Sequence, residues 1–180
     1  MELVEELLPG TWLVRLPHSA DDRGSFVKTY SKGALAHLGL SCELREAFYS
    51  LSAKGVLRGM HFQRPPHDHV KLVHCAAGSV LDVLLDLRAG PGYGKVASAP
   101  LHASSPSSVI VPAGVAHGFR TLEEGSLVLY QTSAEYAPAY DDGVRWDSFG
   151  FDWGVEQPTL SGRDQRHLPL AAFRTPFTAP

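Results

Sequence analysis

Hydrophobic and polar residues alternate along much of the chain with the period of two that is typical of β-strands. In Val80–Leu87 every odd-numbered position is leucine or valine, whereas Asp82 and Asp86 lie on the opposite face. The same alternation runs through Thr11–Leu16 and Ser25–Tyr30. Five further segments have a strand-like pattern: Ala47–Ser52, Val56–Gln63, Lys71–Ala76, Ser108–Val111 and Leu127–Thr132. We therefore expect a chain made mostly of short strands.

One segment has the pattern of a short helix. Ser31 is a suitable N-cap for a helix over Ser31–Leu38, and Gly39 follows directly after its end. Elsewhere the 17 glycines and 13 prolines are spread along the chain, as expected for many turns. Short strands at this density predict an all-β barrel or sandwich, of which a jelly roll is one closed form. The segment after Leu168 is interrupted by prolines and is expected to form a C-terminal tail on the surface.

Composition narrows the function classes. The 180 residues suit a single domain over 1–180, and 16 basic against 19 acidic residues give a net charge of −3. A nucleic-acid binder would usually carry a basic stripe, so this class of partner is not expected. Cys42 and Cys75 are too few for a disulfide framework. The sequence contains neither the apolar run of a signal peptide nor a membrane-spanning stretch, so we expect a cytoplasmic protein without membrane contact.

The nine histidines raise the question of a metal site. On an extended segment His67 and His69 would point the same way, and His117 could supply a third ligand, as in metal-binding cupins. The glutamate usual in such cupins shortly after this pair is absent, and Lys71 near that position would repel a cation. We therefore expect no metal, and we place His67 and His69 in a surface loop.

Several short motifs occur in a fixed order along the chain: Asp22–Phe26, Gly55–Gln63, Lys71–Val73, Asp82–Val83, Asp86–Arg88, Pro112–Phe119 and Leu160–Asp164. In this order and spacing, the sequence from about Asp21 to Asp164 resembles the dTDP-4-dehydrorhamnose 3,5-epimerase family. The resemblance implies a cupin-type jelly roll that acts without metal or cofactor on a nucleotide-linked 4-keto-6-deoxy sugar. It also implies a homodimer, with a barrel core over about 45–135 and N-terminal strands over 11–30 shared with the partner.

Such an epimerase needs a base, a group that stabilises an enolate, and an acid on the opposite face of the sugar. His61 suits the base, because imidazole titrates near neutral pH. By resemblance, Asp164 pairs with this histidine, Lys71 stabilises the enolate oxygen and Tyr130 is the acid. Tyr136 is the reserve candidate for the acid and is otherwise expected to contact the sugar.

The resemblance assigns further positions to substrate binding: Arg23, Lys28, Glu46, Phe48, Arg58, Gln63, His117, Tyr136, Asp141 and Arg163. Arg23, Arg58 and His117 would hold the diphosphate, since guanidinium groups match phosphate oxygens well. Arg163 stands where the family commonly has lysine and Asp141 where it commonly has glutamate, so both changes keep the charge.

Two departures concern positions that contact the nucleotide in the family. Lys28 replaces a common glutamate, and Glu46 with Phe48 replaces a Gln-x-Asn element. The catalytic set is complete while the nucleotide-binding set has changed. This pattern predicts a relative that acts on another sugar nucleotide or a specialised deoxysugar.

Three alternatives stay open from the sequence. A sugar-nucleotide ketoisomerase on the same fold would also need a base and an acid, but would move the carbonyl group. A non-catalytic sugar-binding cupin and a metal-dependent cupin oxygenase are the other two. The sequence does not decide whether C3, C5 or both carbons invert, which nucleotide is the carrier, or whether Tyr130 or Tyr136 is the acid.

Overall fold

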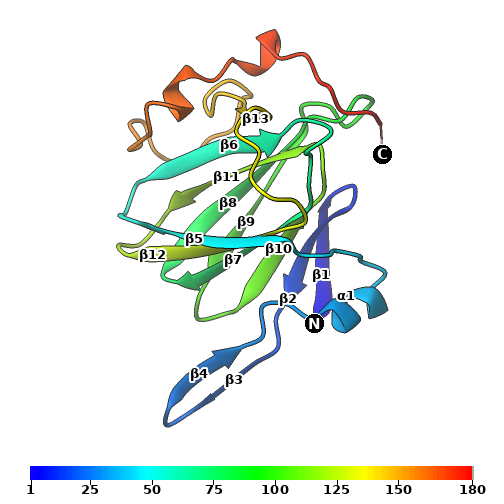
Figure 1. Ribbon diagram of the computed structural model, residues 1–180. Coiled ribbons are helices and arrows are strands. Elements are labelled where there is room, and N and C mark those ends of the chain that lie inside the picture. The colour runs from blue at the N-terminus through cyan, green and yellow to red at the C-terminus, as the bar shows by residue number, and fades with distance from the viewer. Residues whose placement is uncertain (180) are drawn as a thin grey trace.

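The computed structural model describes residues 1–179 and consists mainly of two packed antiparallel sheets (Figure 1). The six-stranded sheet has the order β1 (Glu2–Leu8), β2 (Thr11–Arg15), β10 (Ser107–Val111), β7 (Lys71–Ala77), β12 (Ser126–Thr132) and β5 (Glu46–Ser52). The five-stranded sheet has the order β13 (Asp141–Gly143), β6 (Leu57–Gln63), β11 (Val115–Thr121), β8 (Ser79–Asp86) and β9 (Val96–His102). This arrangement confirms the predicted all-β, cupin-type jelly roll.

The main apolar core fills the space between the two sheets. Val73 and Val128 from the six-stranded sheet pack there against Leu84 and Phe119 from the five-stranded sheet, and all four side chains are fully buried. The predicted alternation in β8 is correct, but both of its faces are buried, since Leu85 on the other face belongs to a second core. The aspartates of β8 therefore lie inside the protein, where a carboxylate requires a partner.

Two further cores cover the outer faces of the sheets. On the five-stranded sheet, Phe62 and Leu87 pack against Trp153 and Phe177 from the segment after β13. In Figure 1 this C-terminal segment, orange to red, runs across the outer side of β6. It includes two single-turn helices, η1 (Asp164–Arg166) and η2 (Leu170–Ala172). The expected tail after Leu168 adds Phe173 and Phe177 to this core, and the residues before it deliver Asp164 to β6.

On the six-stranded sheet, helix α1 (Lys32–His37) buries Leu35 against Val14 and Ile110. The side chain of Ser31 accepts a hydrogen bond from the Ala34 amide, so the predicted N-cap is confirmed. Gly39 follows the helix with a φ of +75°, a conformation that glycine adopts at little cost.

The strand predicted over Ser25–Tyr30 is wrong in its extent. Only Gly24–Val27 forms β4, which pairs with β3 (His18–Asp21) in an exposed hairpin. This hairpin extends away from the two sheets (Figure 1). Tyr30 instead packs beside α1 and donates a hydrogen bond to the Cys42 carbonyl. Apolar and polar residues alternate in this segment, but the hairpin is exposed and packs on no core.

The other predicted strands are present to within one or two residues, whereas β1, β3, β9, β11 and β13 were not predicted as strands. Strand β9 contains Pro100 and β11 contains Gly118, and both residue types lower strand propensity. Both strands are stabilised by pairing with β8 over seven residue pairs. Among residues 1–179 no helix is long and apolar enough to span a membrane.

Candidate active site

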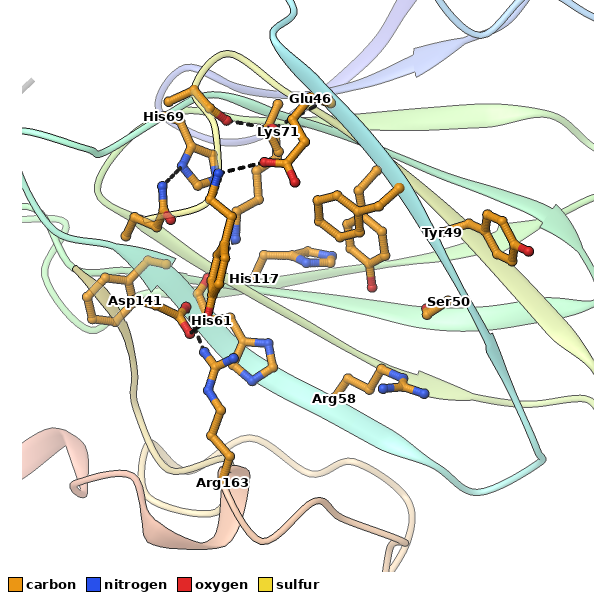
Figure 2. Close-up of a pocket in the computed structure, with 17 residues that line it drawn as sticks. Glu46, Tyr49, Ser50, Arg58, His61, His69, Lys71, His117, Asp141 and Arg163 are labelled. Atoms are coloured by element: carbon orange, nitrogen blue, oxygen red, sulfur yellow. Dashed lines mark hydrogen bonds and ion pairs between the residues drawn. The ribbon is translucent and has the colours of Figure 1, made fainter. Parts of the chain in front are cut away.

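A cavity of about 430 Å³ opens between the sheets and is lined by residues of β5, β6, β7, β11 and β12. Figure 2 shows Glu46 and Lys71 toward one end of this cavity and Arg163 toward the other, with His117 between them. Its lining is Glu46, Phe48, Tyr49, Ser50, Arg58, His61, Phe62, Gln63, His69, Lys71, His117, Tyr130, Thr132, Ala134, Tyr136, Asp141 and Arg163. Twelve sequence positions assigned to catalysis or binding therefore reach one cavity, either in its lining or, for Asp164, directly behind His61.

His61 and Asp164 are brought together from positions 103 residues apart. His61 Nε2 lies 2.7 Å from Asp164 Oδ1, and the His61 side chain is 27% exposed, whereas that of Asp164 is 3% exposed. Burial lowers the pKa of His61 below its usual value, although Asp164 acts in the opposite direction. The imidazole is therefore neutral near pH 7. In the tautomer that donates from Nε2, the other ring nitrogen is free to accept a proton.

The backbone around His61 depends on two glycines. Gly59 has a φ of +146°, and a Cβ built on it would lie 2.6 Å from the Cα of Gly118 on β11. Only glycine permits this close approach of β6 to β11. The Gly59 amide also points to Asp164 Oδ2, at 3.4 Å, and the Asp164 amide donates to Ser161 Oγ. Asp164 is thus fixed by the strand that carries the histidine it contacts.

Asp164 is ionised in this setting. Burial by itself would raise the pKa of the carboxyl group, but the hydrogen bond and charge of His61 and the Gly59 amide outweigh it, and the net shift is downward. A carboxylate beside a neutral imidazole stabilises the imidazolium that forms when the ring takes up a proton.

Lys71 begins β7 and directs its ammonium group into the cavity. Its Nζ donates to the His61 carbonyl at 3.0 Å. Burial lowers the pKa of Lys71 to about 8, although the nearby charge of Asp141 opposes this shift. The group is therefore a cation at pH 7 that is close to its titration range, and it can stabilise a negative oxygen in a largely dry site.

Tyr130 lies on β12 with 9% of its surface exposed. Phe48 from the neighbouring strand stacks on its ring, with centroids 4.8 Å apart, and His117 meets it edge-on at 6.0 Å. Burial is the main cause of a large upward shift in its pKa. The phenol is fully protonated at neutral pH, so it is available to donate to a strongly basic carbon.

His117 forms a second histidine–aspartate pair, which the sequence analysis did not identify. His117 Nε2 lies 2.7 Å from Asp82 Oδ2, and the two side chains are 4% and 0% exposed. His117 is opposite Leu84 in the β11–β8 register and Phe119 is opposite Asp82, so the pair is a diagonal contact across two strands. The resemblance places His117 at the diphosphate, whereas here its Nε2 is already bonded to a carboxylate.

Polar contacts between distant segments form the rim of the cavity. Arg163 donates to Asp141 Oδ1 at 2.8 Å, and the hydroxyl of Tyr136 donates to Asp141 Oδ2 at 3.2 Å. The Glu46 carboxylate accepts from the Tyr136 amide at 2.6 Å. Tyr136 is 58% exposed, so its ring lies at the entrance rather than in the interior.

Gln63 and Arg58 lie on the same strand as His61 but contact different partners. Gln63 is buried; its amide nitrogen donates to the carbonyls of His67 and Glu135, and its amide oxygen accepts from the Ala137 amide. It thereby ties two loops to β6. Arg58 donates a hydrogen bond to Ser52 Oγ, and its side chain faces the cavity (Figure 2).

Arg23 and Lys28 do not line the cavity of their own chain. Arg23 lies at the end of the β3–β4 hairpin, where it pairs with Asp21 and its side chain is 89% exposed. Lys28 directly follows β4 and is exposed.

The three histidines considered as metal ligands have separate contacts. The His67 ring lies on Tyr140 with centroids 4.3 Å apart, His69 Nδ1 accepts from Gln63, and His117 bonds to Asp82. His69 is partly buried and lines the cavity, so it does not lie in a surface loop as expected.

Two site residues were missed although the sequence carried a signal for each. Asp82 interrupts the apolar pattern of its strand on the inward face, which indicates a buried partner. His167 follows Asp164 by three residues, one helical turn, and its Nε2 lies 3.8 Å from Asp164 Oδ1.

Comparison with known proteins identifies the family of the chain. The family model described as dTDP-4-dehydrorhamnose 3,5-epimerase matches residues 5–172. The dTDP-4-dehydrorhamnose 3,5-epimerase of Mycolicibacterium smegmatis is 35% identical over 167 residues, covering 91% of this chain and 83% of the relative. The dTDP-4-dehydrorhamnose 3-epimerase of Streptomyces niveus is 36% identical over 171 residues, covering 93% of this chain and 83% of the relative.

A solved structure of similar shape is the dTDP-4-dehydrorhamnose 3,5-epimerase of Bacillus anthracis, with TDP and PPi bound. It superimposes with a TM-score of 0.90 at 32% identity, covering 93% of this chain and 98% of the other. Both the match along nearly the whole sequence and the likeness of the fold place this chain in the dTDP-4-dehydrorhamnose 3,5-epimerase family.

Proposed function

We propose that this chain epimerises a nucleotide-linked 4-keto-6-deoxy sugar at C3, C5 or both, without a metal. The observation that supports this function best is the convergence of a neutral imidazole backed by a carboxylate, a buried ammonium and a buried phenol on one cavity. These are the base, the enolate-stabilising group and the acid that the reaction requires.

In the proposed mechanism His61 removes the proton from the carbon next to the ketone. The electron pair of the broken C–H bond forms the C=C bond of an enolate, and the negative charge moves to O4. Lys71 stabilises that oxygen, while Asp164 stabilises the imidazolium of His61. Tyr130 then donates its proton to the opposite face of the same carbon, and the carbonyl group is restored with inverted configuration.

Solvent-exchange measurements on paired variants test these assignments. In D2O, His61→Ala should lose both deuterium uptake at C3 and C5 and turnover. Tyr130→Phe should still form the enolate and return deuterium from His61 to the original face, so that labelled substrate accumulates with little inverted product. Mass gain and stereochemistry are read by NMR. Normal inversion by Tyr130→Phe would move the acid role to Tyr136, and undiminished exchange by His61→Ala would overturn the mechanism.

The nucleotide carrier is proposed to differ from the usual one. Glu46 and Phe48 stand on β5 at the cavity, where Glu46 binds the Tyr136 amide and Phe48 covers the ring of Tyr130. Neither side chain offers the paired amide donors and acceptors of a Gln-x-Asn element, and unpaired polar groups discriminate strongly between ligands. Calorimetry with dTDP, UDP, CDP and GDP tests this proposal, and a clear preference for dTDP would contradict it.

We also propose a homodimer in which the β3–β4 hairpin carries Arg23 to the cavity of the partner. The hairpin extends from the body and presents Phe26 with 64% of its surface exposed, which favours a contact with a second chain (Figure 1). Arg58 would then hold the diphosphate from one chain and Arg23 from the other. Light scattering that shows a fully active monomer at micromolar concentration would remove this proposal.

A further inference from the structure

Three groups that can bind a metal ion meet behind the cavity: His61, Asp164 and His167. One ligand atom from each lies within 4.8 Å of the others. His61 Nε2 is 2.7 Å and His167 Nε2 is 3.8 Å from the same oxygen, Asp164 Oδ1. Two imidazoles and one carboxylate are a donor set that zinc prefers, with a fourth position left for water.

His167 has an unused donor atom that points to this cluster. Its side chain is 10% exposed, and its Nε2 is buried without a hydrogen-bond partner. A buried polar atom normally has a partner, and leaving one unpaired costs stability. Because Nε2 is the atom nearest to Asp164, its missing partner would lie between the two side chains.

The ring of His167 is held in place by the strand next to His61. Gly143 of β13 is opposite His61 in the β13–β6 register. A Cβ on Gly143 would lie 2.5 Å from the His167 ring, so the ring lies flat against this glycine and no larger residue fits there. The two imidazoles therefore meet edge to face, with centroids 5.7 Å apart and 67° between the ring planes.

The distances are close to those of a zinc centre. Ligand atoms bound at the usual lengths to a tetrahedral zinc ion lie roughly 3.3–3.6 Å apart. The His61–Asp164 contact would open from 2.7 Å, and the His167–Asp164 contact would shorten from 3.8 Å. The third pair, His61 and His167, lies at no more than 4.8 Å and would also have to shorten, so the site needs side-chain movements of up to roughly 1.5 Å.

The positive charges of Arg163 and Lys71 act on this cluster and oppose a metal ion there, although both groups are directed to other partners. Arg163 donates to Asp141, and Lys71 donates to the His61 carbonyl. His61 Nε2 would lose its proton and bind the ion through its lone pair. The ion would thus take the place of the proton that lies between His61 and Asp164.

We propose that His61, Asp164 and His167 form a zinc-binding site, and that zinc bound there inhibits the enzyme. A metal on His61 would occupy the nitrogen that bonds to Asp164 and would remove the imidazole's capacity to take up a proton. Inhibition thus rests on the proposed role of His61 as the base, whereas zinc binding itself does not.

Calorimetry on metal-free protein with zinc chloride, in the absence of nucleotide sugar, tests the binding because the substrate's diphosphate would itself chelate zinc. One zinc ion per chain should bind in the micromolar range or tighter. His167→Gln should weaken binding by at least the ~10–100-fold that loss of a supporting side chain costs. His61→Gln should weaken it likewise, and serves if His167→Gln does not fold. His102→Gln, an exposed histidine on β9, is the matched control and should bind like the unmodified chain.

Turnover at fixed free zinc tests the inhibition. Zinc should suppress the unmodified enzyme, whereas His167→Gln, compared with its own rate without zinc, should resist the same zinc concentration. Equal binding to the unmodified chain and to His167→Gln, or no binding in the micromolar range, would overturn the site. Binding without loss of turnover would overturn the inhibition alone. If His61→Ala keeps its activity while zinc binding still needs His61, the proposed function fails and the zinc site stands.

Discussion

The His61–Asp164 and His117–Asp82 pairs have the same contact distance but different surroundings. His61 and His117 are direct neighbours across β6 and β11, and each has its Nε2 2.7 Å from a carboxylate. The Asp82 partner of His117 lies on the adjacent strand and is fully buried, whereas the Asp164 partner of His61 comes from the C-terminal segment. The His61 ring is 27% exposed toward the cavity, against 4% for His117.

This difference indicates two roles for one chemical group. A histidine that must exchange a proton with substrate needs an open face and a carboxylate that is fixed independently of the ring. A histidine locked between strands neutralises a buried carboxylate and stabilises the wall of the cavity. Short contacts alone do not distinguish these roles, but exposure and the origin of the carboxylate do.

The largest expected effect separates the pairs by turnover. His61→Gln removes the base and should lower kcat by ~10²–10⁴-fold, the usual contribution of general acid–base catalysis. Its melting temperature should change little, because the side chain is partly exposed. Steady-state kinetics and thermal unfolding on the same preparation measure both. Near-normal turnover of His61→Gln would assign the base elsewhere.

The second prediction separates the pairs by stability. His117→Ala leaves Asp82 as an uncompensated buried charge and should reduce the free energy of unfolding by about 3–5 kcal/mol. Removing the carboxylate as well, in Asp82→Ala/His117→Ala, should recover part of this loss. Urea unfolding of the two single variants and the double variant gives the coupling energy. Strictly additive losses would show that the pair has no structural coupling.

A smaller effect is expected at the carboxylate behind His61. Asp164→Asn keeps the shape of the side chain but removes the charge that stabilises the imidazolium. Turnover should fall by at least ~10-fold, equal to ~1.4 kcal/mol, yet by less than in His61→Gln. Deuterium exchange should fall in parallel with turnover. A variant that retains full exchange would show that Asp164 only positions the loop.

The smallest expected effect is the pH dependence of kcat/KM, which depends on the titrating groups of the cavity. Lys71 has a pKa of about 8, so its ammonium is present below this pH and is lost above it. The value of kcat/KM should therefore fall above about pH 8, by up to ~10-fold per pH unit. On the acid side activity should persist below the usual histidine range, because the pKa of His61 is lowered. Lys71→Arg should abolish the alkaline fall, since guanidinium does not titrate there.

Much of the fold could be predicted from local pattern. The strands β5, β6, β7, β8, β10 and β12 follow from alternation, and the Ser31 cap follows from residue type. Strands β9 and β11 could not be predicted this way, because Pro100 and Gly118 interrupt their pattern and pairing with β8 overrides the weak propensity. The strand predicted over Ser25–Tyr30 extended too far, since only Gly24–Val27 pairs, in a hairpin that covers no sheet face.

The site residues likewise fall into those that the sequence identified and those that only the structure revealed. Resemblance identified Lys71 and Tyr130 as candidates for the cavity, and both line it. It did not identify the partner of His117 or the place of His167, because these contacts depend on strand register and on where the tail crosses β6. It also did not show that Arg23 stands away from the cavity of its own chain, since that depends on the direction of a hairpin.

The sequence by itself determined which short segments form strands, where the helix begins and which side-chain types are available for catalysis. These properties depend on backbone preference and on motifs a few residues long. Only the tertiary structure decided which histidine meets which carboxylate and which pair remains open to substrate. His61 and Asp164 are 103 residues apart, and closure of the sheets together with the path of the C-terminal segment brings them to 2.7 Å. Burial lowers the pKa of His61, the contact with His61 lowers that of Asp164, and no local pattern encodes that shared environment.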